Sequence, residues 1–184
     1  MTEPGRREQH KLTTRRALEE SALRLFARDG FDETSVDAIA ADAGVSPRTF
    51  FRYFATKDEV LDMGREERQA ELKARIRELA TTDLDDLGVV RRAVIDMARG
   101  FETDRNRVLL RQRAAASSPV LRGRLYDTFQ SWEYVVSREL GGDASARVLA
   151  GVGFAVFRAS MAVWLEEGGS LPDVVERGFT ALGR

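Results

Sequence analysis

Three basic side chains, Arg48, Arg52 and Lys57, are this sequence's best candidates for a chemical role, the recognition of nucleic acid. Arg48 and Arg52 are four residues apart, so in a helix they project from the same side. No acidic residue lies between Ser46 and Lys57, so this side carries net positive charge. Arginine binds both backbone phosphates and the edges of guanine bases. The spacing therefore predicts DNA binding.

The residue types that catalysis and metal binding most often need are scarce in this chain. It has no cysteine, which excludes thiol nucleophiles, disulfides and cysteine-ligated zinc. The one histidine, His10, lies in a polar N-terminal segment with no nucleophile beside it. No HExxH motif, phosphate-binding loop or dinucleotide-binding glycine motif occurs. We therefore expect no catalytic residue, no metal site and no cofactor.

Two short helices joined by a tight turn are predicted to present these bases. Apolar residues recur over residues 36–43 with the period of one helical face. Gly44 follows at once, and glycine accepts the positive φ that ends a helix. Ser46 and Pro47 then suit the N-cap and the first position of a second helix over residues 46–54. The pattern favours a helix-turn-helix, and the alternative is an ordinary helical hairpin inside a bundle.

The run from Thr14 to Asp62 closely resembles the N-terminal domain of the tetracycline-repressor (TetR) family of bacterial transcription regulators. The segments LFARDGF and TSVDAIAADAGVSPRTFFRYFATKDEVL carry the resemblance without a gap. The family often has tyrosine, whose hydroxyl touches a phosphate, where this chain has Phe51, which cannot make that contact. Arg48 replaces a small residue of the family, so we expect it to reach bases. The predicted DNA-contacting residues are Thr34, Ser35, Ser46, Pro47, Arg48, Thr49, Phe51, Arg52, Tyr53 and Lys57.

Basic residues are concentrated locally, because the net charge of the chain is −1. Residues 6–16 hold five bases against a single acid, so a site-specific DNA-binding protein is more consistent with the charge than a general nucleic-acid coat. We expect a flexible basic arm over residues 1–10, a DNA-binding domain over 11–62 and a second domain over 63–184. The segment before Lys11 has no apolar run of the kind found in signal peptides, so a cytoplasmic protein is expected.

The fold class is predicted to be all-α with about nine helices, because no sustained alternation of apolar and polar residues indicates strands. Thr34 is the predicted N-cap of the helix over residues 36–43, and Thr56 opens a helix that reaches Leu79. The remaining helices are expected at 11–29, 84–101, 105–116, 118–140, 143–167 and 170–183.

Residues 148–165 contain a single charge, Arg158, and are just long enough to span a membrane. The interior arginine and two glycines argue against a span, so we expect a helix that is buried on all sides. The TetR resemblance implies a homodimer through this helix and its neighbour, residues 119–140. The alternative is the core helix of a monomer.

The resemblance also implies a small-molecule cavity in the second domain and release of DNA when the effector binds. The candidate lining residues are Phe101, Leu109, Arg113, Trp132, Phe154, Phe157 and Arg158. Arginines among apolar residues need an acidic partner. That partner is either an acidic, apolar effector, such as a fatty acid or its thioester, or Glu133 or Glu139. The sequence thus predicts a ligand-responsive repressor that binds a palindromic operator as a homodimer. The alternative is a helical small-molecule-binding protein or enzyme with a vestigial helix-turn-helix.

Overall fold

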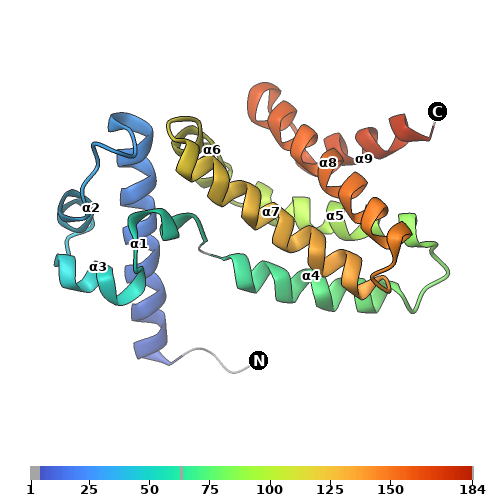
Figure 1. The fold of residues 1–184 in the computed structure, drawn as a ribbon, viewed down its shortest axis with the longest axis horizontal. Coiled ribbons are helices and arrows are strands. Elements are labelled where there is room, and N and C mark those ends of the chain that lie inside the picture. Colours follow the sequence, from blue (N-terminus) through green and yellow to red (C-terminus); the bar gives the residue numbers. More distant parts are fainter. Residues whose placement is uncertain (1–4, 63, 184) are drawn as a thin grey trace. The chain divides into compact units, whose positions relative to one another are not determined.

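The structure, a computed structural model, describes residues 5–62 and 64–183, and every regular element in these ranges is a helix (Figure 1). The expected all-α class is confirmed. The chain forms two compact units: residues up to 62 together with 109–126, and residues 64–108 together with 127–183. Helices α6 (Arg105–Ala116) and α7 (Pro119–Glu139) each contribute residues to both units.

The first unit is built around four helical elements near the N-terminus. They are α1 (Arg6–Asp29), α2 (Val36–Asp42), α3 (Pro47–Tyr53) and the 3-10 helix η1 (Lys57–Asp62). Phe26, Ile39 and Phe50 are fully buried where α1, α2 and α3 meet. Leu121 of α7 belongs to the same core, so residues 109–126 complete a hydrophobic core that the N-terminal helices alone would leave open.

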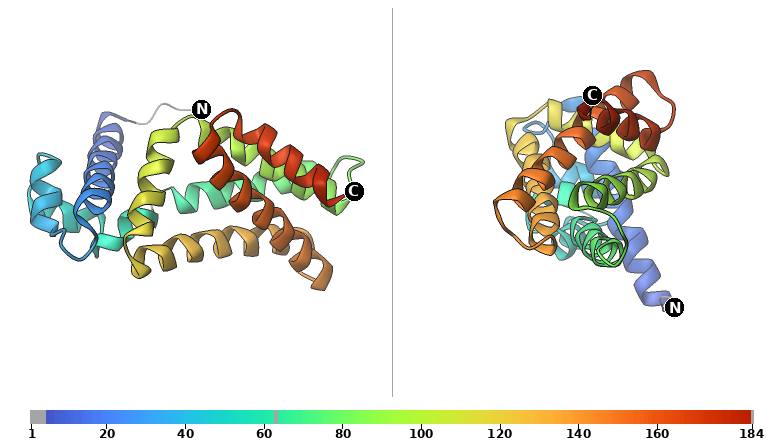
Figure 2. Two further views of the ribbon diagram at one scale, coloured as in Figure 1. Left: turned by 90° about the horizontal axis from the view of Figure 1, so that it is seen from above. Right: turned by 90° about the vertical axis from the view of Figure 1, so that its right-hand side faces the viewer.

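The second unit is a helical bundle with α5 at its centre. Its other helices are α4 (Arg65–Leu79), α8 (Ala144–Glu167) and α9 (Leu171–Leu182), and α5 itself runs from Asp86 to Glu102. Helix α9 packs against both α5 and α8 (Figure 2). Buried aromatic residues of α7 and α8 fill the interior with α5. With the valine, leucine and isoleucine side chains of α4 and α5, these rings form the apolar core of the unit.

Helix α1 begins at Arg6, before the expected start at Lys11. Residues 6–10 are therefore helical, and the expected flexible arm is wrong for them; residues 1–4 of that arm lie outside the described ranges. The sequence from Arg6 to Asp29 has no glycine or proline, so nothing in it interrupts the helix.

The expected helix from Thr56 to Leu79 is two elements, η1 and α4. Gly64 lies before α4 with φ +80°, in the left-handed region that favours glycine. The prediction of one continuous helix is therefore wrong, and the break falls where the chain passes between the two units.

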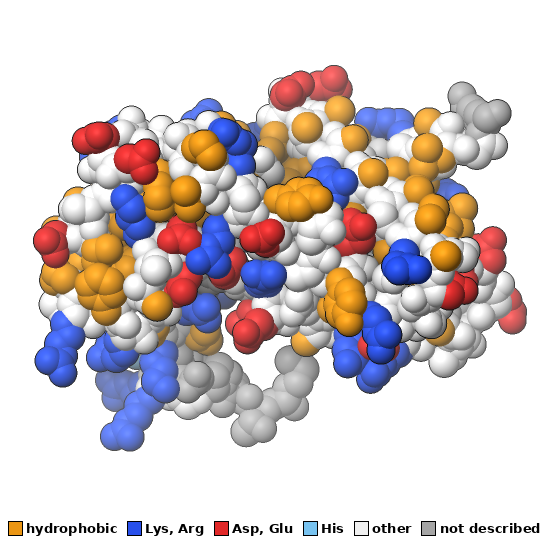
Figure 3. Space-filling view, viewed as in Figure 1, with side chains coloured by type: hydrophobic (Ala, Val, Ile, Leu, Met, Phe, Trp, Pro, Cys, Tyr) orange, Lys and Arg blue, Asp and Glu red, His pale blue; other side chains and the backbone are white. Residues whose placement is uncertain are grey.

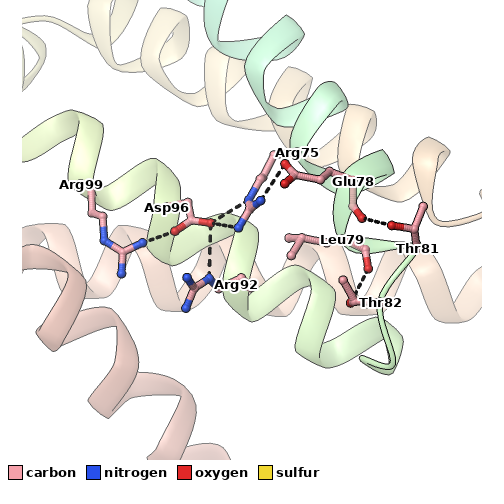
Figure 4. A network of polar contacts seen from close by, with 8 residues as sticks. All are labelled: Arg75, Glu78, Leu79, Thr81, Thr82, Arg92, Asp96 and Arg99. Carbon is pink, nitrogen blue, oxygen red and sulfur yellow. Dashed lines mark hydrogen bonds and ion pairs between the residues drawn. The ribbon is translucent and has the colours of Figure 1, made fainter.

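Asp96 of α5 anchors α4 through a network of arginines (Figure 4). Its carboxylate accepts a hydrogen bond from Arg75 Nε at 2.8 Å and forms ion pairs with Arg92 and Arg99. Arg75 also pairs with Glu78 of its own helix at 2.7 Å. A carboxylate shared by three guanidinium groups joins the helices while leaving net positive charge at the surface.

The expectation that α8 is buried on all sides is wrong for one stripe of the helix. Phe154, Phe157 and Trp164 are buried in the core, but Val148 is 64% exposed and Ala155, Ala159 and Ala162 are also exposed. By length and composition alone α8 could cross a membrane, whereas its largest side chains pack against α5 and α7. This helix thus has one face in the core and one small, apolar, exposed face.

Candidate nucleic-acid interface

Serine side chains cap the two helices of the helix-turn-helix. Ser46 accepts a hydrogen bond from the Thr49 amide at 3.2 Å, and Pro47 occupies the first turn, as predicted. Helix α2 is capped by Ser35, which accepts from the Ala38 amide at 3.1 Å. The prediction of Thr34 as this cap is therefore wrong.

The turn between α2 and α3 has the predicted geometry. Gly44 has φ +69°, and the Val45 amide donates to the Ala40 carbonyl at 2.9 Å. Ala40 is fully buried beside Phe50 of α3. A small residue at this position allows the two helices to approach closely, and their approach orients the outer side of α3.

Three of the predicted contact residues have long or aromatic side chains on the outer side of α3. Arg48 and Arg52 are exposed, and Phe51 is 56% exposed. The Arg52 guanidinium lies 5.1 Å from the centroid of the Tyr53 ring, which is half-buried. Ser35, Ser46 and Pro47 are also exposed, and Thr49 is half-buried. Eight of the ten residues proposed from sequence thus lie in α3 or cap α2 and α3, and all eight are exposed or half-buried.

The other two, Thr34 and Lys57, are turned inward. Thr34 is buried, and its hydroxyl donates to the Gly30 carbonyl at 2.7 Å. Lys57 Nζ donates to the Phe31 carbonyl at 2.6 Å and to the Thr34 carbonyl at 3.0 Å. The same ammonium lies 4.2 Å from the centroid of the Phe31 ring. In this arrangement Lys57 joins the loop between α1 and α2 to the start of η1.

Two arginines outside the N-terminal helices tie α6 and α7 to this unit. Arg111 donates to the Leu61 carbonyl at 2.6 Å and pairs at 3.3 Å with Glu19 of α1, which is buried. Arg124 donates to Asp58 at 2.5 Å and to Asp62 at 3.1 Å. Sequence reasoning missed these contacts, because each joins residues at least 50 positions apart.

The environment of Asp58 favours its charged form. Burial alone would raise the pKa of Asp58, but hydrogen bonds from Thr56 and Arg124 outweigh the burial, so this pKa lies below its usual value. The ion pair with Arg124 is therefore present at neutral pH and joins α7 to η1.

The residues proposed for an effector cavity fall into two groups. Phe101, Trp132, Phe154 and Phe157 share the core of the second unit, with ring centroids 5.3 Å apart for Phe101 and Phe157. Leu109 and Arg113 belong to the first unit instead.

The acidic partner expected for Arg158 is present within the chain. Arg158 Nη1 lies 3.9 Å from the carboxylate of Glu133, one of the two partners named from sequence. The other, Glu139, accepts from Arg77 at 2.6 Å. At 3.9 Å the Glu133 carboxylate forms no hydrogen bond with Arg158 Nη1, which is buried.

Comparison with known proteins relates the helix-turn-helix to a family of bacterial regulators. Residues 19–62 match the family described as bacterial regulatory proteins, tetR family. The transcriptional regulator TcmR of Streptomyces glaucescens is 47% identical over 57 residues, which are 31% of this chain and 25% of TcmR. The transcriptional regulator MftR of Mycobacterium tuberculosis is 28% identical over 188 residues, 97% of this chain and 92% of MftR.

A solved structure has the same fold over nearly its whole length. It is FadR of Thermus thermophilus, a TetR-family repressor in complex with lauroyl-CoA, with a TM-score of 0.57 and 23% identity. The match covers 91% of this chain and 92% of that one. The helical second unit is thus part of the shared architecture.

Proposed function

We propose that this chain is a DNA-binding transcriptional regulator of the TetR family, and that it is a repressor that binds a palindromic operator as a homodimer and is released by a small-molecule effector. The proposal rests on the outer surface of α3. Arg48 and Arg52 are exposed there, and α3 contains no acidic residue. A short helix of this kind fits the major groove of DNA.

In this proposal the residues of the helix-turn-helix divide into two roles. The residues that lie in α3 or cap α2 and α3 contact DNA: Ser35, Ser46, Pro47, Arg48, Thr49, Phe51, Arg52 and Tyr53. Thr34 and Lys57 instead stabilise the loop before α2 through their hydrogen bonds to backbone carbonyls. Phe51 offers an apolar surface, which suits contact with a thymine methyl group rather than a phosphate.

Selection of bound sites from random DNA tests the proposal, with an inverted repeat as the expected result. Arg48→Ala should then flatten the base preference at one position of each half-site, because arginine discriminates guanine by about 1–3 kcal/mol. Arg28→Ala, an exposed arginine of α1, is the matched control and should leave the preference unchanged. If the parent enriches no sequence, DNA binding by α3 is refuted; if the Arg48→Ala and parent preferences superimpose, Arg48 reads no base.

The exposed stripe of α8 supports the proposed homodimer. Val148, Ala155, Ala159 and Ala162 follow one another on one side of the helix and leave an apolar strip open. Tyr134 of α7 is 65% exposed as well. A second copy of this chain would cover such a surface and hold two copies of α3 at a fixed separation.

Ala159→Glu is expected to make the protein monomeric, because the new carboxylate would be buried without a partner in the dimer. Since Ala159 is exposed in the single chain, the variant should keep its helical circular-dichroism spectrum. Ala74→Glu on the exposed side of α4 is the control. Sedimentation and footprinting measure the result. A monomeric parent that still protects a two-fold symmetric site would contradict this assignment.

The effector class follows from the second unit and from a structural relative. The core of this unit is rich in aromatic rings, and the Thermus thermophilus FadR structure contains lauroyl-CoA. We therefore propose an acidic, apolar effector for this chain. We expect a cytoplasmic regulator without enzymatic activity, cofactor or membrane span.

A further inference from the structure

The first turns of α1 lie beside the end of α3 and form a groove with it. The groove has a volume of about 980 Å³ and is lined by Arg6, Arg7, His10, Lys11, Arg52 and Tyr53. It exists because α1 begins at Arg6 and its first turns extend alongside Arg52 and Tyr53.

The groove is strongly basic. Of the six lining residues that the structure describes, four are arginine or lysine and none is acidic. Among the residues that the structure describes, no carboxylate forms an ion pair with Arg6, Arg7 or Arg52. Lysine and arginine side chains also gather at the lower left of the space-filling view, over the N-terminal unit (Figure 3). The guanidinium groups of Arg6, Arg7 and Arg52 therefore carry positive charge that a polyanion could neutralise.

We propose that this groove binds backbone phosphates of duplex DNA next to the bases that α3 reads, so that the start of α1 is a second DNA-contacting element. The inference rests on the proposed function, because α3 must lie on DNA for the groove to reach it. Arg52 belongs to both surfaces, which makes the groove continuous with the reading face of α3.

The dimensions of the helix suit this ligand. From Arg6 to Lys11 the helix axis advances about 7.5 Å, at about 1.5 Å per residue. Successive phosphates of one DNA strand advance by about 3.4 Å along the duplex axis, so the groove spans roughly two steps. Because these residues are already helical, binding orders little additional chain.

Phosphate contacts carry no direct sequence information. The groove should therefore raise affinity for all sequences equally and lengthen the protected site, without changing the bases preferred by α3. These effects distinguish the groove from Arg48, which is expected to change the base preference.

The test is the triple variant Arg6→Ala, Arg7→Ala and Lys11→Ala in the full chain. The control removes three exposed arginines elsewhere in the same unit: Arg28→Ala, Arg113→Ala and Arg122→Ala. Operator affinity is measured from 50 to 200 mM salt, with hydroxyl-radical footprints and site selection on the same proteins.

The slope of log K against log salt is negative, and the groove variant should make it less steep by about two to three units. Each lost phosphate contact removes about 0.9 from its magnitude. Protection should be lost next to each half-site while the selected sequence stays the same, and the control should keep both slope and footprint. Equal losses in the control and groove variants, or an unchanged slope in the groove variant, would overturn the inference. If the parent protein selects no operator, the proposed function itself fails.

Discussion

Replacing Gly153 by alanine is expected to destabilise the second unit by about 1–3 kcal/mol, the usual range for overpacking a core. Gly153 is buried on α8, and a Cβ atom there would overlap Val90 Cγ1 of α5 and lie 3.5 Å from Val94 Cγ2. Both valines are themselves buried in the core. Chemical denaturation followed by circular dichroism measures the change.

Gly123→Ala is the matched control for this substitution. Gly123 lies within α7, and a Cβ at that position would meet no heavy atom within 4 Å. Alanine should therefore stabilise the helix by about 0.5–1 kcal/mol, the difference in helix propensity. If Gly153→Ala proves as well tolerated as Gly123→Ala, then α5 and α8 do not approach as closely at Gly153 as we describe.

The helix-turn-helix could be predicted from sequence because the interactions that form it are local. Ser46 bonds an amide three residues away, and Gly44 alone supplies the positive φ of the turn. Such interactions depend on residue type and spacing, both of which the sequence displays. The first turns of α1 show where such prediction fails. The basic composition of residues 6–10 indicated a flexible arm, but no glycine or proline follows Arg6 before the end of the helix, so the helix extends to Arg6.

The inward roles of Lys57 and Thr34 could not be predicted in this way. Lys57 contacts carbonyls more than 20 positions earlier in the chain, and sequence spacing does not show which distant backbone groups need a donor. A lysine that contacts DNA and a lysine that donates to backbone carbonyls can have the same neighbouring residues in the sequence.

Residue type also did not show how the second half of the chain divides between units. Arg113 and Leu109 lie in a helix that mixes arginines with apolar residues, and α6 contributes residues to both units. Likewise, the composition of α8 indicated burial without showing that one stripe lacks a neighbour. Both features depend on packing between segments that are far apart in sequence.

Arg111 is expected to be among the most sensitive positions of the first unit. Arg111→Met would leave the carboxylate of Glu19, 2% exposed as a side chain, without this cation, and breaking a buried pair costs about 3–5 kcal/mol. It would also remove the hydrogen bond to the Leu61 carbonyl. Because this unit contains α3, operator affinity should fall together with the free energy of unfolding.

A double-mutant cycle distinguishes the ion pair from simple loss of packing. Glu19→Leu combined with Arg111→Met removes both charges and should recover most of the stability, because apolar pairs often replace buried ion pairs at little cost. The Leu61 carbonyl would still lack its donor, so recovery should be incomplete by about 1 kcal/mol. If Arg111→Met alone costs less than about 1 kcal/mol, as an exposed pair would, the pair does not hold α6 to α1. The apolar core that includes Leu121 and the contacts of Arg124 with Asp58 and Asp62 would then hold residues 109–126 in this unit.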